Sequence, residues 1–202
     1  MQAVETETLI LYHTDLRGEW PEEAARALAA RLPYAKRLAV VRPSARARES
    51  LAGIALALRA LSTVMRREVS PRELVFPEGG KPHLTHTRDA GCEEQADFSI
   101  AHSTPFVGCA ALARGRVGLD IEVGESSALA HRVAREAALK AAGLTLAAYP
   151  QVELEAGAAR CGGERWHARA LADFAGASAC LMTSRRVARL EARAIALADL
   201  FR

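Results

Sequence analysis

The sequence of 202 residues has little of several residue types that mark specialised protein classes. It contains four cysteines, which are widely spaced and form no CxxC pair, and this argues against a zinc knuckle or a disulfide-stabilised scaffold. No uncharged apolar run reaches the roughly 18 residues that would span a bilayer, so we expect no membrane partner. The first residues, MQAVETETLI, carry acids where a signal peptide needs a basic region, so we expect a cytoplasmic protein.

Aromatic residues make up 5% of the chain, and lysine is almost absent. Of the 27 basic residues 24 are arginines, which leaves Lys36, Lys81 and Lys140. Ten of the basic residues lie between Arg26 and Arg67, together with a single acid, Glu49. This basic stretch is either a solvated helical face or a docking surface for an anionic partner. Nucleic acid is not the expected partner, because the stretch lacks the interleaved aromatic residues of a stacking platform.

Half of the residues are hydrophobic and a quarter are charged, which is typical of a globular chain with a sizeable core. Apolar runs and helical spacing predict strands at 8–13, 107–113 and 116–123, and helices at 44–62 and 128–142, the last ending at Gly143. A strand followed by a helix occurs twice. The order suggests two similar lobes that meet near Arg114, and we expect an N-terminal lobe at 1–114 and a C-terminal lobe at 115–202.

The segment Val117–Glu122 (VGLDIE) is the strongest local signal of a functional site. Side chains alternate along a strand, so the apolar residues face the core while Asp120 and Glu122 project together, with Cα atoms about 7 Å apart. Paired carboxylates at this spacing suit Mg²⁺, a hard cation that shares its coordination shell with water and substrate phosphates. The alternative is the wet face of an ordinary edge strand.

Two further segments carry residues that suit phosphate chemistry. In the segment Arg135–Lys140 (REAALK), Glu136 and Lys140 lie one helical turn apart, either as a surface ion pair or, if the helix packs on the Asp120 strand, as a third carboxylate and a proton donor. Upstream, Gly79–Pro82 (GGKP) is a glycine-rich turn with one lysine, and Phe98–Ser103 (FSIAHS) places a histidine between small residues.

The order of these segments, GGKP, FSIAHS, GLDIE and REAALK, resembles the 4′-phosphopantetheinyl transferase superfamily, in its two-lobed Sfp-type branch. The family signature reads approximately GKP, FNxSHS, (V/I)G(V/I)D(I/V)E and WxxKEAxxK. The residues 44–62 are similar to the arginine-rich helix of enterobactin-pathway members. The resemblance implies two α+β lobes related by pseudo-twofold symmetry, and a monomer that transfers the phosphopantetheine arm of coenzyme A to a serine of an acyl or peptidyl carrier protein, releasing 3′,5′-ADP.

The resemblance also implies a role for each matching residue. Three carboxylates would hold Mg²⁺ against the pyrophosphate: Asp120, Glu122 and Glu136. The catalytic set would be Asp120, Glu136 as the base that takes the serine proton, and Lys140 opposite the charge on the departing ADP. The coenzyme A contacts would come from Gly80, Lys81, Pro82, His102, Ser103 and Arg48. The carrier protein, usually an acidic helical bundle, would meet the basic stretch.

The chain departs from the family pattern at several positions. Ala101 replaces a serine, Arg132 replaces the tryptophan of WxxKE, and Arg135 replaces its lysine. Only 13 residues separate Glu122 from Glu136, where two-lobed relatives usually have a few dozen, including a helical flap near the carrier. These departures bear on catalysis and carrier recognition, and they leave open the alternative of a non-catalytic relative that binds a carrier protein or coenzyme A.

Overall fold

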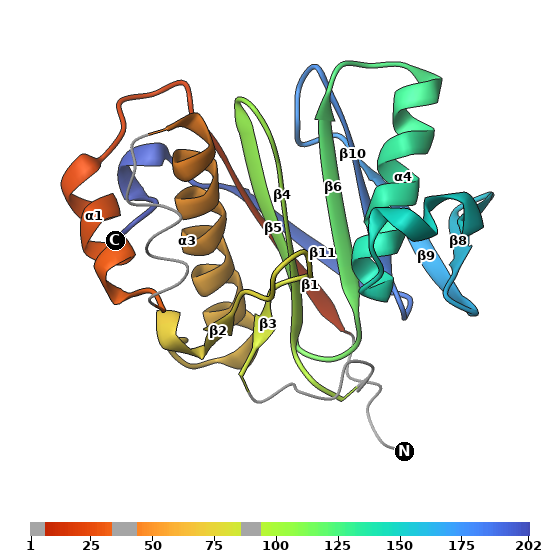
Figure 1. Cartoon of the computed structure of the whole chain (residues 1–202), viewed down its shortest axis with the longest axis horizontal. Coiled ribbons are helices and arrows are strands. Elements are labelled where there is room, and N and C mark those ends of the chain that lie inside the picture. The colour runs from red at the N-terminus through yellow and green to blue at the C-terminus, as the bar shows by residue number, and fades with distance from the viewer. Residues whose placement is uncertain (1–6, 34–43, 86–93) are drawn as a thin grey trace.

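The computed structural model describes residues 7–33, 44–85 and 94–202 of the chain. Within them, helices and strands combine in a mixed α+β arrangement, as the sequence predicted (Figure 1). Helices α1 (Glu22–Arg31) and α3 (Ala45–Met65) lie on one side of the molecule, and α4 (Ser127–Ala142) lies on the other. The strands between them form two larger sheets and one small hairpin.

The first sheet has the strand order β11 (Arg189–Ala194), β1 (Thr8–Asp15), β5 (Phe106–Leu112) and β4 (Asp97–Ser103). Strand β1 pairs antiparallel to β5 and parallel to β11, which comes from the C-terminal end of the chain. Leu197 and Leu200, just after β11, join the apolar core around α3. The last residues therefore lie with the N-terminal sheet, although the sequence-based division assigns all of 115–202 to the second lobe.

Helix α3 packs on the first sheet and begins at a clear sequence signal. The side-chain oxygen of Ser44 accepts a hydrogen bond from the backbone N–H of Ala47 at 3.1 Å, which satisfies one of the free donors at the helix start. Near its middle the helix approaches β4 so closely that a Cβ on Gly53 would lie 2.5 Å from Ile100 Cγ2. The predicted helix at 44–62 is confirmed, and it continues for most of one further turn to Met65.

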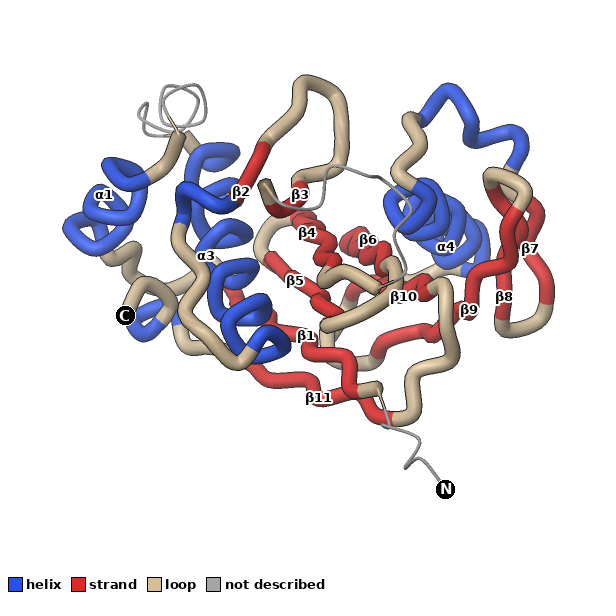
Figure 2. Tube along the Cα trace, turned by 90° about the horizontal axis from the view of Figure 1, so that it is seen from below, coloured by secondary structure: helices blue, strands red, loops and turns tan. Residues whose placement is uncertain are grey.

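The second sheet has the strand order β6 (Val117–Val123), β10 (Ala177–Thr183), β9 (Glu164–Leu171), β8 (Ala158–Cys161) and β7 (Glu153–Glu155). Helix α4 covers one face of this sheet (Figure 2). Ser126 accepts a hydrogen bond from the N–H of Leu129 at the start of α4, and Gly143 ends the helix in the left-handed conformation with φ of 69°. The predicted strand at 116–123 and the predicted end of the helix at Gly143 are confirmed.

The two sheets meet along β4 and β6, which lie side by side but belong to different backbone ladders (Figures 1 and 2). Side chains of β4 replace the missing ladder by accepting hydrogen bonds from backbone N–H groups of β6. These bonds run from Val117 to Asp97 Oδ2 at 2.8 Å, from Leu119 to Ser99 Oγ at 3.0 Å, and from Val123 to Ser103 Oγ at 3.1 Å. We call this contact the β4–β6 seam. It fixes β6, and everything that β6 carries, relative to the first sheet.

The structure also bears on the cysteines and on membrane-spanning segments. Three cysteines are buried and free, namely Cys109, Cys161 and Cys180, while Cys92 lies outside the described residues. Among the residues that the structure describes, no helix has the length and apolar character needed to cross a membrane.

Candidate metal centre

Strand β6 places its apolar and acidic side chains on opposite faces, as the alternation predicted. Val117, Leu119 and Ile121 are buried in the core between the two sheets. Asp120 and Glu122 face α4 instead, and Asp120 is only 4% exposed. The alternative of an ordinary wet edge strand therefore does not describe Asp120, whose carboxylate is held away from solvent.

Gly118 sets the distance between β6 and α4. A Cβ at this position would lie 1.9 Å from the carbonyl oxygen of Ala137 and 2.5 Å from the backbone nitrogen of Ala141. Both atoms belong to the helix backbone, so no side-chain movement can make room for a larger residue. The alanines of α4 and the glycine of β6 together let the helix rest directly on the strand.

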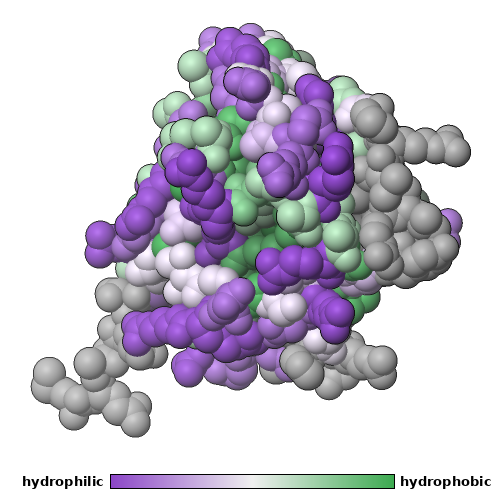
Figure 3. Space-filling view, turned by 90° about the vertical axis from the view of Figure 1, so that its left-hand side faces the viewer, coloured by the Kyte–Doolittle hydropathy of each residue, from purple (hydrophilic) through white to green (hydrophobic). Residues whose placement is uncertain are grey.

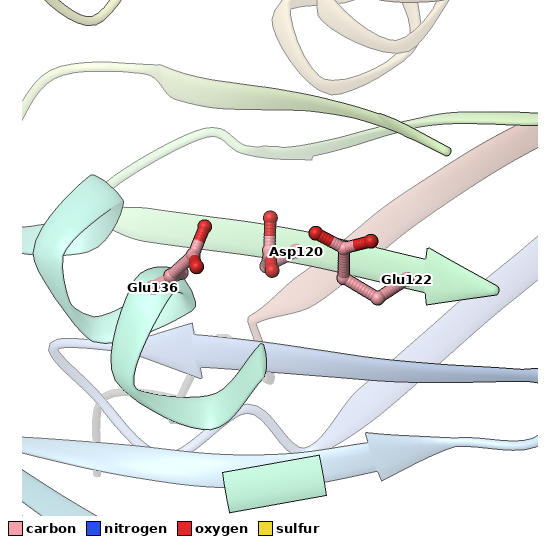
Figure 4. A group of neighbouring side chains, drawn as sticks. All are labelled: Asp120, Glu122 and Glu136. Carbon is pink, nitrogen blue, oxygen red and sulfur yellow. The ribbon is translucent and has the colours of Figure 1, made fainter. Parts of the chain in front are cut away.

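This close packing brings the third predicted carboxylate to the other two. Glu136 on α4 faces Asp120 and Glu122 on β6, and one carboxylate oxygen from each lies within 4.8 Å of the others (Figure 4). The three residues come from two elements that are separate in sequence but adjacent at Gly118. The described chain thus forms the acidic cluster that the resemblance implied, and this cluster can hold a metal ion.

The two oxygens of Asp120 have different surroundings. Oδ1 accepts a hydrogen bond from Lys140 Nζ at 2.7 Å, whereas Oδ2 is buried and accepts a hydrogen bond from none of the described residues. Burial raises the pKa of Asp120, the charge of Lys140 opposes that shift, and the charge of Glu122 adds to it. An ionised oxygen in this position lacks a positive partner, which is the environment that a bound cation would complete.

Glu122 and Glu136 share a second cationic side chain, that of Arg132. The guanidinium nitrogen Nη2 of Arg132 lies 2.9 Å from Glu122 Oε1, and its Nε lies 3.9 Å from Glu136 Oε1. Ser103 Oγ, at the end of the β4–β6 seam, lies 3.3 Å from Glu122 Oε2 and donates a hydrogen bond to it. The pKa of Glu136 is raised, chiefly by burial and then by the charge of Asp120.

Lys140 therefore does not form the surface ion pair with Glu136 that its i, i+4 spacing allows. Its ammonium lies across the helix–strand contact on Asp120, and the i, i+4 pair on this helix joins Arg132 to Glu136. Lys140 engages Oδ1 of Asp120 and leaves Oδ2 without a hydrogen bond from the described residues. All ligand atoms are carboxylate oxygens, and this donor set suits Mg²⁺, Mn²⁺ or Ca²⁺ rather than zinc.

A pocket of about 540 Å³ connects the cluster to the GGKP segment. The segment is the turn between the short strands β2 (Leu74–Val75) and β3 (His83–Leu84). Its residues 79–82 line the pocket together with Glu136 and Lys140 of α4 and Ile100 of β4. Gly80, Pro82 and Glu136 are therefore brought to one cavity.

Lys81 lines the same pocket, but its ammonium is already engaged at the seam. It donates a hydrogen bond to the carbonyl oxygen of Val117 at 2.8 Å and forms an ion pair with Asp97. The side chains of Lys81 and Asp97 are 16% and 18% exposed, so this pair is largely withdrawn from solvent. Within the structure the lysine ties the GGKP turn to β6.

Arg48 lies on α3 and His102 contacts that helix, and the contacts of both residues lie outside the acidic cluster. His102 Nδ1 is 3.3 Å from Glu49 Oε2, and Thr104 also donates a hydrogen bond to Glu49. Arg48 forms an ion pair with Glu22 at 3.3 Å, and its guanidinium lies 5.5 Å from the centre of the Trp20 ring. Their predicted contacts with coenzyme A stay predictions.

The basic stretch at 26–67 is described only in part, because Lys36, Arg37 and Arg42 lie outside the described residues. Several of its arginines are exposed, including Arg26 and Arg46. Others are paired within the molecule, as Arg67 is with Glu73. On the face that carries α1, hydrophilic side chains surround patches of apolar surface (Figure 3).

Three residues that shape the site were not predicted from the sequence, although the sequence contains a pattern that points to each of them. Arg132 precedes Glu136 by one helical turn, the spacing of an ion pair. Glu49 is the only acid in the basic stretch. Asp97 begins the strand that leads to His102, and alternation along this strand aims it, like Ser99 and Ser103, at β6.

Comparisons with known proteins add no assignment to this geometry. No protein-family model matches the chain, and no curated protein matches it either.

Proposed function

We propose that this protein transfers the phosphopantetheine arm of coenzyme A to a serine hydroxyl of an acyl or peptidyl carrier protein, with Mg²⁺ as the metal. One observation carries the proposal. Four motifs that resemble those of the transferase superfamily, although spread over more than sixty residues, converge on one pocket and one acidic cluster. A chance likeness of short motifs gives no reason for Asp120, Glu136, Lys140 and the GGKP turn to meet.

The fold supports the proposal through the relation of its two halves. In each half a long helix covers a sheet, α3 over β4 and β5 and α4 over β6 and β10. We propose that these halves are the two pseudo-symmetric lobes of the transferase fold, divided between β5 and β6 near Arg114. The return of β11 to β1 ties the C-terminal end to the first lobe.

The carboxylates of Asp120, Glu122 and Glu136 would hold Mg²⁺, which supplies positive charge to the pyrophosphate of coenzyme A when it is bound. The buried and unpartnered Asp120 Oδ2 is the atom that most needs such a cation. Lys140 orients Asp120 through Oδ1 and adds a positive charge at the end of the pocket, where the departing 3′,5′-ADP gains negative charge.

In this proposal Glu136 accepts the serine proton. It faces the pocket as well as the cluster, so its carboxylate is accessible to a hydroxyl group that enters from the pocket side. Its raised pKa makes it a stronger base than an exposed glutamate. The nucleotide would lie along the GGKP turn, with Gly80 and Pro82 beside the adenine, Ser103 near the phosphates, and Lys81, His102 and Arg48 as further contacts.

The alternative is a relative that binds coenzyme A or a carrier protein without catalysis. Arg132 favours it, because its guanidinium pairs with two of the three carboxylates that the reaction would assign to the metal. The two proposals differ in the fate of coenzyme A. A transferase consumes it, whereas a binding protein returns it unchanged.

The decisive experiment is incubation of the protein with coenzyme A, Mg²⁺ and candidate apo-carrier proteins, followed by intact mass spectrometry. Transfer adds the mass of one phosphopantetheine to the carrier and releases 3′,5′-ADP. The variant Asp120→Ala should lose this activity while keeping its circular dichroism spectrum, because the carboxylate serves the metal rather than the fold. Turnover near the level of the unmodified protein in this variant would contradict the metal assignment. Binding of coenzyme A without any transfer would favour the alternative.

A further inference from the structure

Arg132 occupies an unusual place for a cationic side chain. It lies on α4 one turn before Glu136, and it reaches across to β6, where its Nη2 is 2.9 Å from Glu122 Oε1. Its Nε is 3.9 Å from Glu136 Oε1 on its own helix. One guanidinium therefore contacts two of the three carboxylates of the cluster, one on β6 and one on α4. The Arg132 side chain is 48% exposed.

The charges around the cluster are nearly balanced without a metal. Three carboxylates face the ammonium of Lys140 and the guanidinium of Arg132. The two cations act differently, since Lys140 binds Asp120 Oδ1 and leaves Oδ2 without a partner. Arg132 instead forms ion pairs with the carboxylates of Glu122 and Glu136, at 2.9 Å and 3.9 Å.

We propose that Arg132 is an internal counter-ion that competes with the divalent cation for Glu122 and Glu136, and thereby lowers the metal affinity of this site. A guanidinium cannot release its charge by losing a proton, so it must move away before both carboxylates turn to one ion. Its half-exposed position provides that freedom. The inference rests on the metal site of the proposed function, but not on the transfer reaction.

The arrangement gives the protein a resting state in which the single positive charge of Arg132 offsets part of the negative charge of Glu122 and Glu136. An acidic cluster without any cation is destabilised by repulsion between its like charges. Arg132 relieves this repulsion when the metal is absent, and it repels the metal when the metal arrives. Removal of its charge should therefore destabilise the metal-free protein and strengthen metal binding at the same time.

The test compares Arg132→Gln with Arg135→Gln. Arg135 is the matched control, since it lies on the same helix three residues later and its guanidinium is 5.4 Å from the centre of the Tyr149 ring, where it contacts none of the three carboxylates. Both variants lose one positive charge from α4. Binding of Mn²⁺ alone is measured by electron paramagnetic resonance, and binding of Mg²⁺ by calorimetry. We expect Arg132→Gln to bind Mn²⁺ on the order of tenfold more tightly, because a unit charge near the site no longer opposes a divalent ion.

The shift of the thermal midpoint on addition of Mn²⁺ provides a second readout, and Arg135→Gln shows how much of it a general loss of charge produces. Arg132→Gln should melt at a lower temperature than the unmodified protein in chelator and should gain more from added Mn²⁺, whereas Arg135→Gln should keep the Mn²⁺ response of the unmodified protein. Equal Mn²⁺ affinity in both variants, or weaker binding by Arg132→Gln, would overturn the inference. Tighter binding without any transfer to a carrier would uphold the inference and count against the proposed reaction.

Discussion

The close contact at Gly118 leads to the sharpest test of how the site is built. An alanine here would place its Cβ 1.9 Å from the carbonyl oxygen of Ala137, whereas ordinary contact begins at 3.4 Å. Helix α4 would therefore have to retreat by roughly 1.5 Å, the difference between these distances. Overpacking of this kind costs about 1–3 kcal/mol. We expect Gly118→Ala to lie at the upper end, about 3 kcal/mol, because both obstructing atoms belong to the helix backbone.

The same retreat would carry Glu136 and Lys140 away from Asp120. We expect the variant to lose metal affinity together with stability. If the proposed function holds, its transfer activity should fall by about a hundredfold, the loss that a misplacement near 1 Å can cause. Urea denaturation followed by circular dichroism gives the free energy of unfolding, and Mn²⁺ titration gives the affinity. Gly18→Ala is the control, since its Cβ would meet Leu197 at an ordinary 3.5 Å. If Gly118→Ala changes stability by no more than this control and binds Mn²⁺ normally, the helix does not rest on β6 as described.

Two further predictions concern the cluster and the seam. Because the pKa of Asp120 is raised in the folded chain, its contribution to stability is present below its unfolded pKa and is lost as the pH rises through the folded value. In chelator, the unfolding free energy of Asp120→Asn should therefore exceed that of the unmodified protein by ~1 kcal/mol at neutral pH. The two free energies should be equal near about pH 4, where Asp120 is protonated in the folded chain. A difference that does not change with pH would contradict this reasoning. Ser99→Ala removes the acceptor of the buried Leu119 N–H and should cost about 1–2 kcal/mol in urea denaturation, whereas Ser103→Ala, nearer the surface, should cost less.

The elements that carry the site were predictable because their signals are local. The alternation in VGLDIE fixes which side chains of β6 share a face, and the same periodicity holds in the observed strand. Helix α4 ends at Gly143 because a glycine adopts the left-handed cap without a steric penalty. A strand face and a helix face can thus be read from spacing alone.

The ion-pair partners of the charged residues could not be predicted from local sequence patterns. The spacing of Glu136 and Lys140 allows an ion pair along the helix, yet Lys140 binds Asp120. Gly118 lets β6 lie directly against α4, and this brings Asp120 within reach of the Lys140 ammonium. The pairing of β11 with β1 joins residues about 180 positions apart, and no local pattern encodes such a contact. Lys81 was expected at a phosphate, and its contact with Asp97 depends on where β3 meets β4.

One position of the seam, Ala101, bears on the buried Asp120. Position 101 faces Ile121 in the same register that joins Ser99 to Leu119 and Ser103 to Val123, but Ala101 has no oxygen to accept a hydrogen bond. The backbone N–H of Ile121 lowers the pKa of the neighbouring Asp120 carboxylate, against the larger effect of burial. The serine that the family pattern would place at 101 would compete for this N–H. The gap in the seam therefore leaves a backbone donor to the buried aspartate, and it does so at the strand residue next to the cluster.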